Sequence, residues 1–157
     1  MRVVKKIVMR VALCLLALFL LINVSWYVWR VIKYELYNTG MEKSVFATWL
    51  VPRYGQIDAD GYDYGVKYPD YLTLTGNLSV GCPTTDDDMF TDALIIWPKF
   101  FGGYEYGAIL YESGETFYIY INADGSAVDL EDNDVVVRHQ ENIDVLLRKA
   151  KEMWDLE

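Results

Sequence analysis

"ALIIWPKFFGGYEYGAILYESGETFYIYI", residues 93–121, decides the fold because apolar segments of strand length are separated here by short turns. The Gly-Gly dipeptide at 102–103 and the Ser-Gly dipeptide at 113–114 are typical of turns that join antiparallel strands. The first segment, 93–98, is apolar without interruption, which predicts a strand buried on both faces. This stretch therefore predicts three consecutive antiparallel strands.

The sequence on either side extends this sheet. Residues 71–82 alternate between apolar and polar side chains, which predicts a strand with one buried face. A third turn, "NADGSA" at 122–127, precedes a brief strand near Val128 or at 135–137. The expected sheet is an antiparallel meander of four or five strands within residues 71–137.

Helices are expected on both sides of this sheet in the sequence. A helix at 139–155 carries one apolar stripe and should cover the inner face of the sheet; the stripe comprises Ile143, Leu146, Leu147, Ala150 and Met153 or Trp154. A short amphipathic helix is also expected at 41–51, where Pro52 ends it and its apolar face adds to that cover. Residues 53–70 are rich in Gly, Asp and Tyr and are expected to form turns. The fold class is α+β.

A second decisive stretch is "RVALCLLALFLLINVSWYVWR", residues 10–30. Val11 to Trp29 contain no charged residue, and as a helix they span about 28 Å, close to the thickness of bilayer hydrocarbon. We expect a basic tail at 1–10, a transmembrane helix at 11–30, a helical extension at 31–40 and an acidic domain at 41–157. The alternative is a signal peptide whose cleavage releases a secreted domain. The apolar run exceeds the 7 to 15 residues usual for such a signal, and no convincing pair of small residues marks a cleavage site.

The distribution of charge predicts the orientation and limits the partners. Four basic residues precede the apolar run and two follow it, which favours a cytoplasmic N-terminus and a C-terminal domain outside the cell membrane. From Tyr37 onward 8 basic residues face 22 acidic ones, a net charge of −14. An acidic domain repels phosphate backbones, so nucleic-acid binding is not expected. The two cysteines, Cys14 and Cys82, are too far apart in this scheme for a disulfide.

The acidic turn "DADGYD" is a candidate cation site. Asp58, Asp60 and Asp63 could present carboxylate oxygens around a glycine, as calcium requires. The bidentate Glu that ends a complete calcium loop is missing, and Asp-Gly is also common turn chemistry. No cofactor is expected otherwise. The acidic segments 86–88 and 124–134 are expected to be solvated loops and turns.

Aromatic side chains surround the same turn and give a candidate ligand site. Tyr54 and Tyr64, together with the three aspartates, could form a platform for a ligand. The other interpretation is that the tyrosines of this loop (Tyr54, Tyr62, Tyr64, Tyr68 and Tyr71) pack against the sheet. Phe100 and Phe101, at the tip of the Gly-Gly turn, are likewise expected to fold back on the core rather than enter a bilayer or a partner.

No catalytic motif is found in the sequence, so binding is the expected activity. There is no phosphate-binding glycine loop, no nucleophile elbow and no pair of His or Cys at zinc-ligand spacing. We expect a single-pass membrane protein whose outer domain binds a protein partner or a ligand. The alternative is a small envelope enzyme or inhibitor that uses the loop at 53–71.

Overall fold

The computed structural model describes residues 2–48, 50–84 and 91–156, which form two compact units, Met1–Leu36 and Tyr37–Glu157. The first unit is a single helix, α1 (Arg2–Glu35), followed by a turn in which Gly40 has a positive φ. The side chains from Val4 to Ile22 are exposed all around this helix. An N-terminal helix is therefore present that is long and apolar enough to span a membrane.

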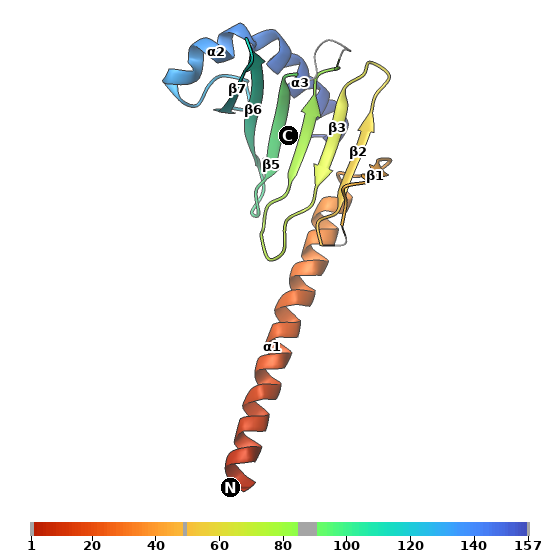
Figure 1. Cartoon of the computed structure of the whole chain (residues 1–157), viewed down its shortest axis with the longest axis vertical. Helices are drawn as coiled ribbons and strands as arrows, with labels where there is room; N and C mark the ends of the chain where they lie inside the picture. The colour runs from red at the N-terminus through yellow and green to blue at the C-terminus, as the bar shows by residue number, and fades with distance from the viewer. Residues whose placement is uncertain (1, 49, 85–90, 157) are drawn as a thin grey trace. The chain divides into compact units, whose positions relative to one another are not determined.

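The second unit, which we call the domain, is an α+β structure built on one antiparallel sheet (Figure 1). Its seven strands follow one another in space as they do in sequence: β1 (Glu42–Lys43), β2 (Arg53–Ile57), β3 (Asp63–Lys67), β4 (Asn77–Gly81), β5 (Ala93–Pro98), β6 (Tyr104–Glu112) and β7 (Glu115–Ile121). A 3₁₀ turn (Leu130–Asp132), the short helix α2 (Asn133–Arg138) and the helix α3 (Gln140–Trp154) complete the chain.

The predicted sheet of four or five strands is too small, because the stretch 41–67 contributes three of the seven strands. The prediction of a helix at 41–51 is wrong, because β1 and a turn occupy the described part of this stretch. Residues 53–67, expected to be turns, form the hairpin β2–β3. Gly55 and Gly65 stand opposite each other in that hairpin, and glycines within strands resemble turn signals in a sequence.

Other strand boundaries also differ from the expectation. Residues 71–76 are a loop, in which Leu72 has a φ of 58° and an exposed side chain, and β4 begins only at Asn77. The last expected strand is absent at 135–137, because these residues belong to α2. Ala127 instead makes an isolated bridge to Ile121.

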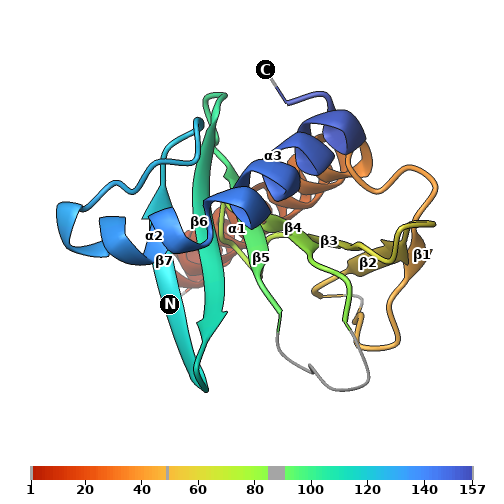
Figure 2. The same cartoon turned by 90° about the horizontal axis from the view of Figure 1, so that it is seen from above.

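The core lies between the sheet and α3, which packs against β4 and β5 (Figure 2). Every second residue of the central strands points to this inner face and is buried, as Leu78, Val80, Leu94, Ile96, Ala108 and Leu110 show. From α3 come Ile143, Leu146, Leu147, Ala150 and Trp154, the stripe expected from the sequence. This helix accounts for one face of the sheet only.

The outer face of the sheet carries apolar side chains that α3 does not cover. The segment 93–98 was expected to be buried on both faces, but only Leu94, Ile96 and Pro98 are buried. Ile95 and Trp97 point to the outer face and remain partly exposed. The unbroken apolar run thus has two causes, a core on one side and an apolar surface on the other.

Because the two faces differ in burial, shortening neighbouring side chains to alanine should lower the free energy of unfolding by unequal amounts. Ile96→Ala should lower the free energy of unfolding by about 2–5 kcal/mol, because it leaves a cavity in the core. Ile95→Ala should cost about 1 kcal/mol, since its side chain is only partly removed from water. Urea unfolding of the full chain in detergent micelles, followed by near-UV circular dichroism, measures both. Equal losses would mean that both faces are buried.

Candidate binding groove

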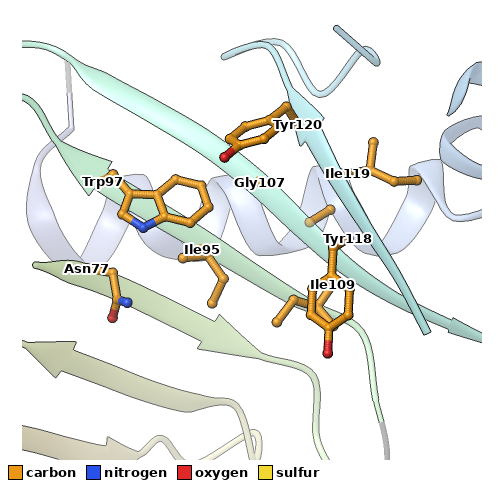
Figure 3. Close-up of a pocket in the computed structure, with 9 residues that line it drawn as sticks. Asn77, Ile95, Trp97, Gly107, Ile109, Tyr118, Ile119 and Tyr120 are labelled. Carbon is orange, nitrogen blue, oxygen red and sulfur yellow. The ribbon is translucent and has the colours of Figure 1, made fainter. Parts of the chain in front are cut away.

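A hollow of about 400 Å³ lies on the outer face of the sheet over β5, β6 and β7. Figure 3 shows its aromatic and aliphatic walls; the lining side chains include Asn77, Ile95, Trp97, Ile109, Tyr118 and Tyr120. The rings of Trp97 and Tyr120 lie 5.8 Å apart between centroids, at an interplanar angle of 41°. An apolar hollow with a few polar groups at its rim is the usual form of a binding site.

Gly107 forms the floor of this hollow and lets the Trp97 ring lie across β6 (Figure 3). A Cβ atom at this position would stand 2.9 Å from Cη2 and Cζ3 of Trp97. Any larger residue would therefore push the indole out of its place. The glycine keeps the hollow open and sets the position of its largest ring.

A second hollow, of about 590 Å³, lies on the same face over β2, β3 and β4. Its lining is more polar than that of the first hollow and includes Arg53, Asp63, Lys67 and Ser79 beside Phe46, with Gly65 in the floor. Burial raises the pKa of Asp63 above its usual value. Asn77 lines both hollows, so an aromatic half and a polar half adjoin at β4.

The two hollows lie along one row of residues that stand opposite one another on adjacent strands. This row crosses six strands and consists of Gly55, Gly65, Ser79, Ile95, Gly107 and Tyr120. Three of its six members lack a side chain, and a missing side chain leaves a depression on a pleated surface. We call the two hollows together the binding groove. It crosses the strands and is open to an extended ligand.

The acidic turn expected to bind a ligand or calcium is instead tied to α3. Lys149 Nζ lies 2.8 Å from Asp58 Oδ2 and 2.7 Å from Asp60 Oδ2, and it stands over the ring of Tyr62. Asp58 Oδ1 accepts hydrogen bonds from the backbone N–H groups of Asp60 and Tyr62, and Tyr64 Oη donates to Asp58 Oδ2. The Lys149 ammonium lowers the pKa of Asp58 to about 2.

The remaining predicted site residues lie apart from this cluster. Asp63 belongs to the outer face and lines the polar hollow. Tyr54 points to the inner face, where its ring packs 5.5 Å from the buried ring of Tyr68. Within residues 2–48, 50–84 and 91–156, no group of three or more His, Cys, Asp or Glu residues is placed to hold a metal ion. The calcium hypothesis has no support from this geometry.

The other acidic segments are accounted for where the structure describes them. Asp124 Oδ1 accepts hydrogen bonds from the backbone and hydroxyl of Ser126, which closes the turn after β7. The aspartates at 86–88 lie outside the described residues. Of the tyrosines expected to pack on the sheet, Tyr64 and Tyr68 are buried, while Tyr71 is exposed.

A buried polar cluster that sequence reasoning missed joins the far end of the sheet to α3. Asp92, only 5% exposed, lies 2.7 Å from His139 Nδ1 and accepts a hydrogen bond of 2.8 Å from Asn142 Nδ2. Its other oxygen accepts from the backbone N–H of Tyr111. Three groups that are distant in sequence from Asp92 thus meet on its carboxylate, which fixes the start of α3 over β5 and β6. A buried carboxylate with this many donors is well satisfied as a structural link.

Cys82 lies close to this cluster but is a poor nucleophile. Its backbone N–H donates to the Asp92 carbonyl, and its own carbonyl accepts from Thr91 Oγ1. Burial and the nearby Asp92 carboxylate raise the pKa of the Cys82 thiol to about 11. The thiolate, which is the reactive form, is therefore scarce near neutral pH.

Comparisons with known proteins returned nothing: no family model, curated protein or solved structure matches this chain.

The Asp58–Lys149 contact predicts a specific pH dependence of stability. Because the pKa of Asp58 is lowered from 3.8 to about 2 on folding, its contribution is complete above about pH 4 and is lost towards pH 2. Asp58→Asn should therefore lower the Tm at pH 6, and its deficit relative to the unsubstituted chain should shrink as the pH falls. Calorimetry of the full chain in detergent from pH 6 to pH 2 measures this.

Asp60→Asn is the matched control for that measurement. Asp60 also contacts Lys149, but its side chain is 71% exposed and solvent screens the pair. Its Tm deficit at pH 6 should be smaller than that of Asp58→Asn. A deficit for Asp58→Asn that stays constant across the pH range would contradict the assigned contact.

Proposed function

We propose that this chain is a single-pass membrane protein whose domain binds a protein partner through the binding groove. The helix α1 anchors the chain in the cell membrane, with the N-terminus in the cytoplasm and the domain outside. The partner contributes an extended segment that crosses the strands. Its apolar side chains occupy the half of the groove around Trp97, and its polar groups meet the half around Arg53 and Asp63.

The observation that carries this proposal is the aromatic half of the groove. Tyr118 and Tyr120 are 77% and 59% exposed on a sheet face that no other described element of the domain covers. Large rings in water are costly for an isolated domain, whereas at interfaces they supply much contact area with little loss of side-chain entropy. Apolar rings with a polar rim are also the composition of the centre of protein interfaces.

Two features of α1 support the anchor. Its apolar side chains surround the helix instead of forming one stripe, as expected for a helix surrounded by lipid. Near its C-terminal end, the Arg30 guanidinium lies 4.4 Å from the Trp26 ring centroid, and Lys33 stands over Trp29. Aromatic and basic residues together are typical of the level of the lipid headgroups.

Binding is better supported than the alternative of an enzyme or inhibitor acting through the loop at 53–71. The carboxylates of Asp58 and Asp60 in that loop already have a cation, Lys149. Tyr64 is buried against Trp154, with 5.9 Å between the ring centroids. These side chains hold the β2–β3 hairpin on α3 and leave little of the loop for a substrate.

Photo-crosslinking in intact cells tests this function. The full chain carries p-benzoylphenylalanine in place of Tyr118, or in place of Arg148 on the exposed side of α3 as the control. We expect one defined protein adduct from position 118, in the membrane fraction, and none from position 148. The adduct should be lost in the Gly107→Ala background, because the added methyl group displaces Trp97.

The outcomes separate specific docking from contact by chance. An adduct of the same mass from both positions, or one that survives Gly107→Ala, would contradict docking in the groove. An adduct of twice the chain mass would identify the partner as a second copy of this chain. Circular dichroism of the purified Gly107→Ala chain shows whether the domain remains folded.

A further inference from the structure

The point at which the chain enters the domain is fixed by side-chain contacts. Trp154 Nε1 donates a hydrogen bond of 2.9 Å to the Tyr37 carbonyl, and Asn38 Nδ2 donates to Tyr68 Oη at 3.0 Å. The hydroxyl of Tyr37 lies 3.5 Å from that of Tyr104. These partners sit where β3 ends and β6 begins, so the chain enters at this end of the sheet. We call it the proximal end.

Three loops at the proximal end are residues 43–53, 67–77 and 98–104, and the turn at 122–127 after β7 lies at the same end. Figure 1 shows the second and third of them together at the lower end of the sheet. All three expose large apolar side chains; these are Val45, Phe46, Leu50, Tyr71, Leu72, Leu74, Phe100 and Phe101. Most of the large apolar side chains exposed in the described part of the domain are therefore at one end.

The pair Phe100–Phe101 is the most prominent part of this surface. Both rings were expected to fold back on the core, but Phe101 is 97% exposed and Phe100 is 43% exposed. The two rings pack edge to face on each other, with 4.9 Å between their centroids. Across the domain in the 43–53 loop, Val45 is 91% exposed. These positions are turn tips, where a polar residue would satisfy the backbone equally well.

The proximal loops also differ in charge from the rest of the domain. Residues 43–53, 67–77 and 98–104 together contain four basic residues and one acidic residue; the basic ones are Lys43, Arg53, Lys67 and Lys99. Lys67 pairs with Asp70 and Lys99 with Glu105, and the turn at 122–127 adds Asp124, so the excess of positive charge comes from Lys43 and Arg53. The remainder of the domain contains 4 basic and 21 acidic residues. The other end of the sheet carries Asp58 and Asp60 in the β2–β3 turn and Glu112 and Glu115 at the strand ends beside the β6–β7 turn. An apolar, aromatic and basic surface is complementary to the headgroup region of an anionic bilayer.

Chain connectivity brings this surface near lipid. Only seven residues separate Trp29, the end of the uncharged run, from Tyr37 at the proximal end. As a helix this stretch spans about 12 Å, which is roughly twice the thickness of one headgroup layer. Resting on the anchor assigned above, we propose that the proximal end of the domain docks on the membrane surface, with Phe100 and Phe101 inserted among the lipids. The occupant of this apolar surface is the bilayer that holds α1.

Docking is tested with an environment-sensitive fluorophore on the full chain in nanodiscs of phosphatidylcholine and phosphatidylglycerol. The label is attached at Phe101→Cys, in a chain that also carries Cys14→Ala and Cys82→Ala. The matched control is Glu115→Cys, an exposed position at the turn between β6 and β7. We expect blue-shifted emission at position 101 that is largely lost with doxyl-labelled lipids. At position 115 we expect emission as in water, lost with aqueous iodide.

Three outcomes decide between the alternatives. Labels at 101 and 115 with equal access to iodide would overturn membrane docking. So would a label at 101 that is shielded in cell membranes but exposed in nanodiscs, because a protein would then cover the surface. Extraction of the chain from membranes by alkaline carbonate would refute the anchor itself, whatever the label reports. Circular dichroism of each labelled chain shows that its fold is unchanged.

Discussion

A sheet has two faces, and this domain has one long helix with which to cover them. α3 places its apolar stripe on the inner face of the sheet, over Leu78, Leu94 and Ile96. Strand alternation sends the intervening residues to the other side, so Ile95, Trp97 and Tyr120 have no partner layer among the described elements of the domain. The groove, and with it the proposed function, follows from this imbalance.

Polar contacts at three places along α3 hold it in the position that creates the imbalance. Near its start, Asp92 is held by His139 and Asn142, and the bonds are shielded from water. Further along, Lys149 holds the β2–β3 turn through Asp58, and Trp154 binds the Tyr37 carbonyl at the proximal end. The helix is thereby fixed along its length. The carboxylate of Asp58, a candidate ligand in the sequence, thus serves to position α3.

The sequence predicted best where the periodicity was strong and uninterrupted. The α3 stripe and the hairpin turns at 102–103 and 113–114 were found because they follow from helix period and turn chemistry. The β2–β3 hairpin was missed because Gly55 and Gly65, which stand opposite each other in strands, are also turn-forming residues. The alternation of Leu72 and Leu74 with polar residues led to the prediction of a strand there, although both leucines belong to an exposed loop.

The candidate groove could not be predicted from local patterns. Its walls come from residues that are distant in sequence, such as Asn77 and Tyr120, and its floor depends on a register shared by six strands. The apolar residues of the outer face also looked like core residues, since hydropathy does not reveal which face of a strand is covered. Likewise, nothing near Asp92 in the sequence indicates its pairing with His139, 47 residues away.

Hydroxyl-radical footprinting of Tyr118 and Tyr120 tests most directly whether the outer face of the sheet is exposed to water in the purified chain and covered by a partner in cells. The oxidation of these rings is compared between the purified full chain in nanodiscs and the same chain in intact cells, with Leu130, which is 94% exposed and belongs to neither proposed surface, as the reference. The account predicts rapid oxidation of both tyrosines in the purified chain and strong protection in cells. Slow oxidation in the purified chain, or equal oxidation in the two settings, would contradict it.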